Sequence, residues 1–184
     1  MREHDTKKTA PPWRVPVAFE DIPESGQSFS LAADAEVRAA LARLTGLRDL
    51  PQLHADLEVM RHRSDGLRVI GRVSAVVGQN CVVTLEPLEN SIDEEVDLLF
   101  VPAAPAAAAA AADGSARSEA NSEGPEPLVG GEIDLGAIVT EFFILGIDPY
   151  PRKPGAVFEL PQDLRPEEGP FAALAGWTKG RGDG

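Results

Sequence analysis

The sequence predicts an α+β fold in which an antiparallel β meander is packed by a few amphipathic helices. Three observations predict this class. Between residues 55 and 101, consecutive segments alternate apolar and polar side chains, as strands with one buried face do. Segments 35–45 and 135–145 instead repeat apolar residues at helical spacing. An alanine-rich, acidic stretch at 102–127 interrupts this pattern and is expected to be a disordered insertion.

The length and composition predict one domain. The chain has 184 residues, of which 43% are hydrophobic, and this is enough for one hydrophobic core. We expect a single domain at 13–179, interrupted by the insertion at 102–127. Residues 1–12 should form a disordered tail, and residues 180–184 should fray.

The expected location is the cytoplasm, without membrane contact. No stretch approaches the roughly 20 apolar residues of a membrane helix. The first residues lack the apolar segment of a signal peptide. The single cysteine fits a reducing compartment.

The first predicted element is a strand at 13–19, where apolar side chains alternate with other residues. Pro16 has no backbone N–H, so this strand should lie at an edge. A turn is expected at 24–27. A helix should follow, capped by Asp34 and ended by Gly46. Its apolar face should consist of Val37, Leu41 and Leu44.

Four strands of an antiparallel meander are expected next. They lie at 55–61, 67–77, 81–85 and 92–101. The connections between them should fall at 64–66, 78–80 and 87–90. In the fourth strand the alternation places apolar residues on one face, namely Ile92, Val96, Leu98 and Phe100. Asp93, Glu95 and Asp97 should lie on the other face.

A second helix should begin after Asp134, which can cap it, and end near Gly146 and Pro149. Its apolar stripe consists of Leu135, Ile138, Val139, Phe142 and Leu145. Phe158 is expected in a short extended segment. A C-terminal helix should begin at Pro170 and present Phe171, Leu174 and Trp177.

The charge is concentrated in the middle of the chain. The net charge is −13, and residues 86–141 hold 13 of the 30 acidic side chains against one basic residue, Arg117. Such a segment should repel a phosphate backbone and attract a basic protein. An acidic surface also simply keeps a small protein soluble, so both interpretations stand.

Few side chains are suited to catalysis. His54 and His62 flank one predicted strand and would lie about 26 Å apart at full extension, too far to share a metal. The sequence has no phosphate-binding loop, nucleophile elbow or zinc-protease motif. Cys81 is most simply a small buried hydrophobe. We therefore expect no catalytic residue, no cofactor, no metal site and no enzymatic activity.

Two sequence blocks carry a family resemblance. The first spans 81–89 and contains a pattern formed by Cys81, Thr84, Leu85 and Pro87. The second spans 132–152, and a short segment at 170–174 closes the match. With these blocks the chain resembles the YceD-like family of bacterial large ribosomal RNA subunit accumulation proteins, from about Trp13 to about Lys179.

One departure from the family pattern concerns metal binding. Many YceD-like proteins carry Cys-x-x-Cys in the first block, and further cysteines in some members would make a four-thiolate zinc site plausible. Here Thr84 stands in the second position, and no later cysteine follows. One thiolate cannot build such a site, so we expect ordinary packing there, with Thr84 hydrogen-bonding locally.

The resemblance implies a role in ribosome biogenesis, namely the accumulation of 23S rRNA and assembly of the large ribosomal subunit. In one mechanism the protein is an acidic adaptor that binds a basic ribosomal protein or rRNA-processing factor. The candidate binding residues are Glu94, Asp97, Asp134, Glu141, Tyr150 and Arg152. Tyr150 and Arg152 could equally be structural, with the ring packed and the guanidinium paired.

In a second mechanism the protein binds precursor rRNA directly. The candidate residues lie on one hairpin and are Arg61, Arg63, Arg68 and Arg72. Arg68 and Arg72 share a strand face that could bind phosphates, although arginines also solvate exposed sheet faces. A metal-dependent hydrolase acting on precursor RNA is a third alternative. The sequence leaves the bound component, the assembly stage and the oligomeric state open.

Overall fold

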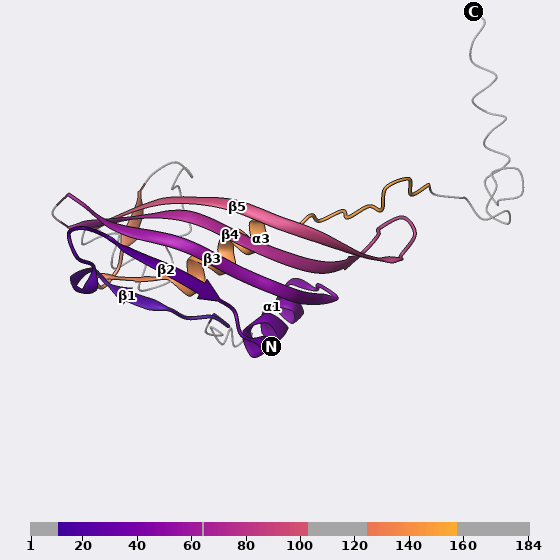
Figure 1. Ribbon diagram of the computed structural model, residues 1–184, viewed down its shortest axis with the longest axis horizontal. Coiled ribbons are helices and arrows are strands. Elements are labelled where there is room, and N and C mark those ends of the chain that lie inside the picture. The colour runs from indigo at the N-terminus through magenta and orange to yellow at the C-terminus, as the bar shows by residue number, and fades with distance from the viewer. Residues whose placement is uncertain (1–10, 64, 103–124, 158–184) are drawn as a thin grey trace, which may run out of the picture.

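The computed structural model describes residues 11–63, 65–102 and 125–157 (Figure 1). The expected N-terminal tail lies almost entirely outside these residues. So do most of the expected insertion, the extended segment at Phe158, the C-terminal helix and the C-terminal fray. The expectation of one domain at 13–179 likewise extends beyond them.

Ten elements follow one another along the described chain. They are β1 (Pro16–Ala18), the 3₁₀ helix η1 (Phe19–Asp21), β2 (Gln27–Ala32), α1 (Ala35–Thr45), β3 (Asp49–His62), β4 (Gly66–Asn80), β5 (Pro87–Pro102), β6 (Glu126–Leu128), β7 (Glu132–Asp134) and α3 (Leu135–Leu145). This arrangement confirms the predicted α+β class.

Most strands belong to one twisted sheet. Its order is β2-β3-β4-β5-β6, antiparallel from β2 to β5, with the short β6 parallel to the end of β5. β1 and β7 form a separate two-stranded ribbon. In Figure 1 the long strands β3, β4 and β5 lie side by side, with α3 behind them and α1 near one end.

The β4–β5 connection differs from the prediction. The strand expected at 81–85 and the turns expected at 78–80 and 87–90 were wrong. β4 continues to Asn80, which pairs with Pro87, the first residue of β5. The connection is a turn at 81–86, in which the Cys81 N–H donates to the Glu86 carbonyl over 2.8 Å. Gly78 lies within β4, where the Asp49 carboxylate occupies the space that a Cβ would take.

The N-terminal strands also differ from the prediction. The strand expected at 13–19 is reduced to β1, and Pro16 lies in this short ribbon at the margin of the fold, as its missing N–H requires. β2 was not predicted. It follows the expected turn and directs Phe29 towards the core while Ser28 and Ser30 are exposed.

One face of the large sheet holds the core. The predicted apolar sets of β3 and β4 are buried there, namely Ala55, Leu57, Val59, Leu67, Val69, Val73, Ala75 and Val77. Ile92 and Val96 of β5 join them. Helices α1 and α3 contact β3, β4 and β5. The opposite face of the sheet is exposed along these strands.

Both predicted helices form, but each buries one face slightly differently from the prediction. Asp34 caps α1 through the Val37 N–H, and Gly46 ends it in the left-handed conformation at φ 69°. Leu41 is buried, whereas Leu44 is 63% exposed. In α3, Phe143 is fully buried and Leu145 is 70% exposed, so the buried stripe ends one turn earlier than predicted.

Candidate partner-binding surface

The exposed face of β3, β4 and β5 carries rows of charged side chains. We call it the outer face and define it by the acidic residues Asp56, Glu58, Asp93, Glu95 and Asp97 and the basic residues Arg68 and Arg72. Strand alternation turns these side chains away from the core. The antiparallel register places the β4 arginines between the acidic rows of β3 and β5.

Both outer-face arginines are paired with carboxylates of β5. Arg68 donates from Nε and Nη2 to the two Asp97 oxygens over 2.9 and 2.8 Å. Arg72 donates to Asp93 over 2.8 Å and to Glu95 over 2.9 Å. The hydrogen bonds with Arg68 lower the pKa of Asp97, and those with Asp97 raise the pKa of Arg68. The predicted phosphate-binding strip is therefore occupied by this chain's own acids.

The β3 row adds further negative charge. His54 Nε2 lies 2.9 Å from Asp56 Oδ2. A hydrogen bond from the Ser30 hydroxyl lowers the pKa of Asp56, and the charge of His54 and its hydrogen bond lower it further. Glu58 is exposed two residues further along the strand. Carboxylates thus outnumber guanidinium groups on the outer face.

The four candidate RNA-binding arginines do not share one surface. Arg61 points to the core side, where its Nε donates to the Ile22 carbonyl over 2.6 Å and its guanidinium carbon lies 4.6 Å from the centre of the Phe19 ring. Arg63 lies in the hairpin turn with φ 56°. Only Arg68 and Arg72 share the outer face.

The candidate acidic residues also divide between two sides of the sheet. Asp97 lies on the outer face, whereas Glu94 alternates to the core side, beside the end of α3. Glu141 is exposed on α3. Of the two candidate acids on β5, only Asp97 therefore lies on the outer face, beside Asp93 and Glu95 as the alternation predicts.

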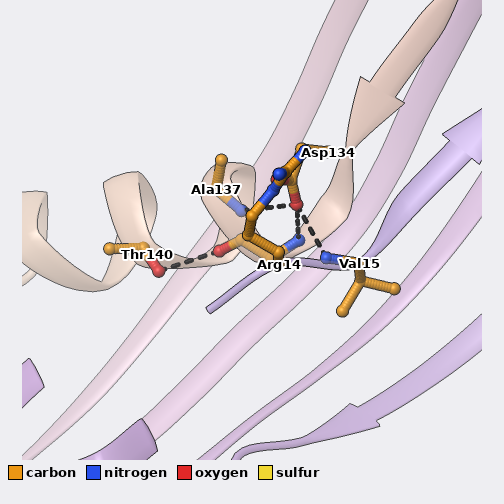
Figure 2. Close-up of polar contacts among 6 residues, drawn as sticks. Arg14, Val15, Asp134, Ala137 and Thr140 are labelled. Carbon is orange, nitrogen blue, oxygen red and sulfur yellow. Dashed lines mark hydrogen bonds and ion pairs between the residues drawn. The ribbon is translucent and has the colours of Figure 1, made fainter. Parts of the chain in front are cut away.

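Asp134 is engaged within the fold (Figure 2). Its Oδ1 accepts hydrogen bonds from the N–H groups of Val15, Gly136 and Ala137 over 2.8, 3.0 and 3.2 Å. Arg14 Nε lies 3.3 Å from Oδ2. The predicted helix cap is confirmed, and the same carboxylate also holds the N-terminal segment against α3.

The family pattern forms a turn at the end of the sheet. The fully buried Cys81 Sγ accepts the N–H groups of Lys153 and Thr84 over 3.4 and 3.5 Å. These donors lower the pKa of the thiol to about 6, and the Lys153 N–H has the largest effect. Thr84 hydrogen-bonds locally to Glu86 over 3.2 Å. Leu85 adopts φ 60° and is 76% exposed.

The segment after α3 closes against this turn. The Val82 N–H donates to the Pro151 carbonyl over 2.9 Å, and Lys153 Nζ lies 3.0 Å from Glu86 Oε2. Tyr150 donates its N–H to Asp148, but its side chain is not packed, because the residue is 71% exposed. Arg152 is exposed and has no carboxylate partner in the described part of the chain. The backbone of this motif is therefore structural, while both side chains are accessible.

Part of this surface was not recognised in the sequence. Asp56 and Glu58 were not proposed as binding residues, although they alternate with the apolar set of the predicted strand at 55–61. That alternation was sufficient to place them on the exposed face. The pairing of β4 arginines with β5 acids needed the strand register, which the sequence pattern does not specify.

Across 11–63, 65–102 and 125–157, no three His, Cys, Asp or Glu side chains are grouped so that they could hold a metal ion. In the same ranges, no helix combines the length and apolar character needed to cross a membrane.

Comparison with known protein families gives a match over more than half of the chain. A family model described as "Large ribosomal RNA subunit accumulation protein YceD" matches residues 69–174. The matched range includes the β5 row of the outer face, the Cys81 turn, α3 and the segment around Tyr150. Neither the curated proteins nor the solved structures gave a match to the chain.

Proposed function

Since the chain belongs to the YceD family of large ribosomal RNA subunit accumulation proteins, we propose that it is a cytoplasmic, non-enzymatic adaptor. It binds a basic ribosomal protein or rRNA-processing factor and so supports the accumulation of 23S rRNA and assembly of the large ribosomal subunit. The acidic outer face supports this mechanism. Reversible binding of a basic partner needs complementary charge and no reactive group.

The pairing of Arg68 and Arg72 is the observation that carries the proposal. A phosphate that approached either guanidinium group would compete with Asp93, Glu95 or Asp97 for its N–H donors. The remaining carboxylates would still repel the nucleic acid backbone. A lysine or arginine of a protein partner is instead attracted, because the carboxylates of the outer face outnumber its guanidinium groups.

Tyr150 and Arg152 are a second proposed contact. Tyr150 is 71% exposed on a segment whose backbone is fixed by the Cys81 turn. A rigidly placed aromatic ring offers contact area at a low entropic cost. Tyr150→Ala should weaken partner binding without lowering the thermal midpoint of unfolding. Loss of thermal stability in this variant would instead assign the ring a structural role.

The role in assembly is tested by depleting the protein in its host. Mature 23S rRNA is quantified against small-subunit rRNA, and precursor ends are mapped in the same sample. A selective loss of the large-subunit RNA is the expected result. Slower growth with an unchanged ratio would contradict the proposed function.

The binding mechanism is tested with a double variant, Arg68→Gln with Arg72→Gln. Its effect on RNA affinity and on capture of basic ribosomal proteins is compared with Arg43→Gln, which changes an exposed arginine of α1. We expect capture of basic proteins to persist or increase, since the change releases carboxylates on β5. A salt-sensitive RNA affinity that falls only in the double variant would favour direct RNA binding. Metal-dependent RNA cleavage abolished by a single Asp or Glu substitution would show a hydrolase.

A further inference from the structure

Strand β5 leaves most of one edge unpaired. β4 pairs with β5 from Pro87 to Phe100, whereas β6 pairs with it only over residues 100–102. Within the described ranges, no strand lies on the other side of residues 87–99. β5 forms the upper margin of the sheet in Figure 1. Alternate residues of this edge direct N–H and C=O groups outwards, which another strand can pair with.

The two sides of this edge differ in chemistry. On the outer side lie the carboxylates of Asp93, Glu95 and Asp97. On the core side, at the end of β5 next to β6, lies a groove of about 470 Å³ that is bounded by β5, β6, β7 and α3. Its lining includes the apolar side chains of Leu98, Phe100, Phe142 and Leu145 and the carboxylates of Glu132 and Glu141.

We propose that the β5 edge binds an extended polypeptide segment as an added strand, and that basic and apolar residues alternate in this segment. The proposal rests on the proposed function and identifies the part of the basic partner that is bound. Side chains of a strand alternate between its two faces. Every second residue would therefore meet the β5 carboxylates, and the intervening residues beside Leu98 would meet the apolar groove.

A second copy of this chain is a poor occupant of the same edge. Pairing β5 with β5 would bring two rows of acidic side chains together, and like charges across a strand pair are destabilising. An RNA strand offers no amide groups to complete the ladder and is repelled by the same carboxylates. Charge complementarity and the apolar groove together favour a basic protein segment.

The test uses two synthetic peptides of about ten residues, enough to span most of the edge at roughly 3.3 Å per residue. In one peptide lysine and valine alternate; in the other the same residues form a lysine block and a valine block. Binding to the full chain is measured by fluorescence anisotropy. We expect the alternating peptide to bind about tenfold more tightly, because only it presents lysine and valine on opposite faces.

Amide hydrogen exchange measured by NMR locates the bound peptide. Protection should appear at alternate residues within 87–99. Equal affinity for both peptides, or protection confined to other strands, would overturn the proposal. Dimerisation of the chain that protects the same amides and excludes the peptide would also overturn it, in favour of a second copy.

A matched pair of variants tests the groove. Leu145→Asp adds a charge to the groove, whereas Leu44→Asp adds the same charge to an exposed position of α1. We expect Leu145→Asp to weaken binding of the alternating peptide about fivefold and Leu44→Asp to leave it unchanged. Equal affinities in correctly folded variants would remove the groove from the site. Selective loss of 23S rRNA on depletion, without peptide binding, would reject the edge site and retain the proposed function.

Discussion

At the scale of single residues, Asp134 has the largest number of structural contacts among the candidate binding residues. Its Oδ1 caps α3 and also accepts the Val15 N–H from a segment 119 residues earlier in the chain. Most helix caps satisfy only groups of their own helix. Removing this carboxylate should therefore affect both α3 and the β1–β7 ribbon.

Asp134→Ala is expected to lower the free energy of unfolding by about 2–3 kcal/mol, since several N–H groups lose a charged acceptor. Asp34→Ala is the matched control, because Asp34 caps α1 through one hydrogen bond to Val37. Asp34→Ala should lower the free energy of unfolding by about 1 kcal/mol. Urea unfolding followed by circular dichroism measures both values. Equal losses in the two variants would show that the link to Val15 contributes nothing.

Cys81 supplies a prediction about pH. The N–H groups of Lys153 and Thr84 lower the pKa of the folded thiol to about 6, whereas an ordinary thiol titrates near 8.5. Because the pKa is lower in the folded state, the thiolate stabilises the fold fully above about pH 8.5. This contribution is lost as the pH falls through about 6.

The thiolate can be observed by its ultraviolet absorbance, with Cys81→Ser as the blank. We expect a midpoint of about 6 in the folded protein. The difference in unfolding free energy between the wild type and Cys81→Ser should decrease as the pH is lowered from about 8.5 towards that midpoint. A thiol that titrates above pH 8 would contradict both expectations.

At the scale of elements, Gly71 determines how closely β3 and β4 approach. It has φ 154°, and a Cβ at this position would overlap the Asp56 carbonyl oxygen and lie 2.8 Å from the Leu57 Cα. Both are backbone atoms, so neither can move aside alone. The two strands fit together here because one of them has no side chain.

Gly71→Ala should therefore destabilise the protein by about 3 kcal/mol or more. Gly46→Ala provides the comparison. Gly46 also has a positive φ of 69°, but nothing lies within 4 Å of the position its Cβ would take. Gly46→Ala should lower the free energy of unfolding by only about 1 kcal/mol, because alanine disfavours the left-handed conformation. If thermal unfolding gave the same loss for both variants, the close approach of β3 to β4 would be unimportant.

Elements with a clear local pattern could be predicted from the sequence. Both helices, their aspartate caps and the β3–β4 hairpin followed from periodicity and turn residues. The connection at 81–86 could not, because Val82, Val83 and Thr84 favour strand locally. The turn is held instead by the hydrogen bonds from the Cys81 N–H to the Glu86 carbonyl and from the Val82 N–H to the Pro151 carbonyl. Gly78 favours a turn locally, but it lies within β4, where the Asp49 carboxylate occupies the space that a Cβ would take.

The candidate surface was predictable only in part. Alternation placed Asp93, Glu95 and Asp97 on one face of a strand, and the structure confirms this. It could not show that Arg68 and Arg72 lie opposite those acids, because register depends on the whole hairpin. Nor could it show that Arg61 turns to Ile22 on the core side, since this contact joins residues 39 positions apart.

At the scale of the whole molecule, the net charge of −13 should make stability depend on salt. Like charges repel within a compact protein, and salt screens this repulsion. The screening length falls from about 30 Å at 0.01 M salt to about 10 Å at 0.1 M. The exposed pairs of Arg68 and Arg72 oppose the effect only weakly, because such pairs contribute about 0–1 kcal/mol.

The thermal midpoint should consequently rise by about 2 °C between these two salt concentrations, measured by circular dichroism. Glu58→Lys reduces the negative charge of the outer face and should show a smaller rise. A midpoint that falls when salt is added would mean that ion pairs, rather than repulsion, dominate the electrostatics of the fold.

The β1–β7 ribbon also has a consequence for the order in which the chain folds. Residues 16–18 pair with residues 132–134, so β1 leaves the ribosome long before its partner has been synthesised. Until then, Trp13 and Val17 cannot pack against α3, and the large sheet lacks the contacts that the β1–β7 ribbon makes in the complete fold. Such distant contacts are slow to form because a long loop must close first. During synthesis the apolar side chains of the sheet therefore lack their α3 partners until residues 135–145 emerge, and we expect aggregation and chaperone binding to be greatest in that interval.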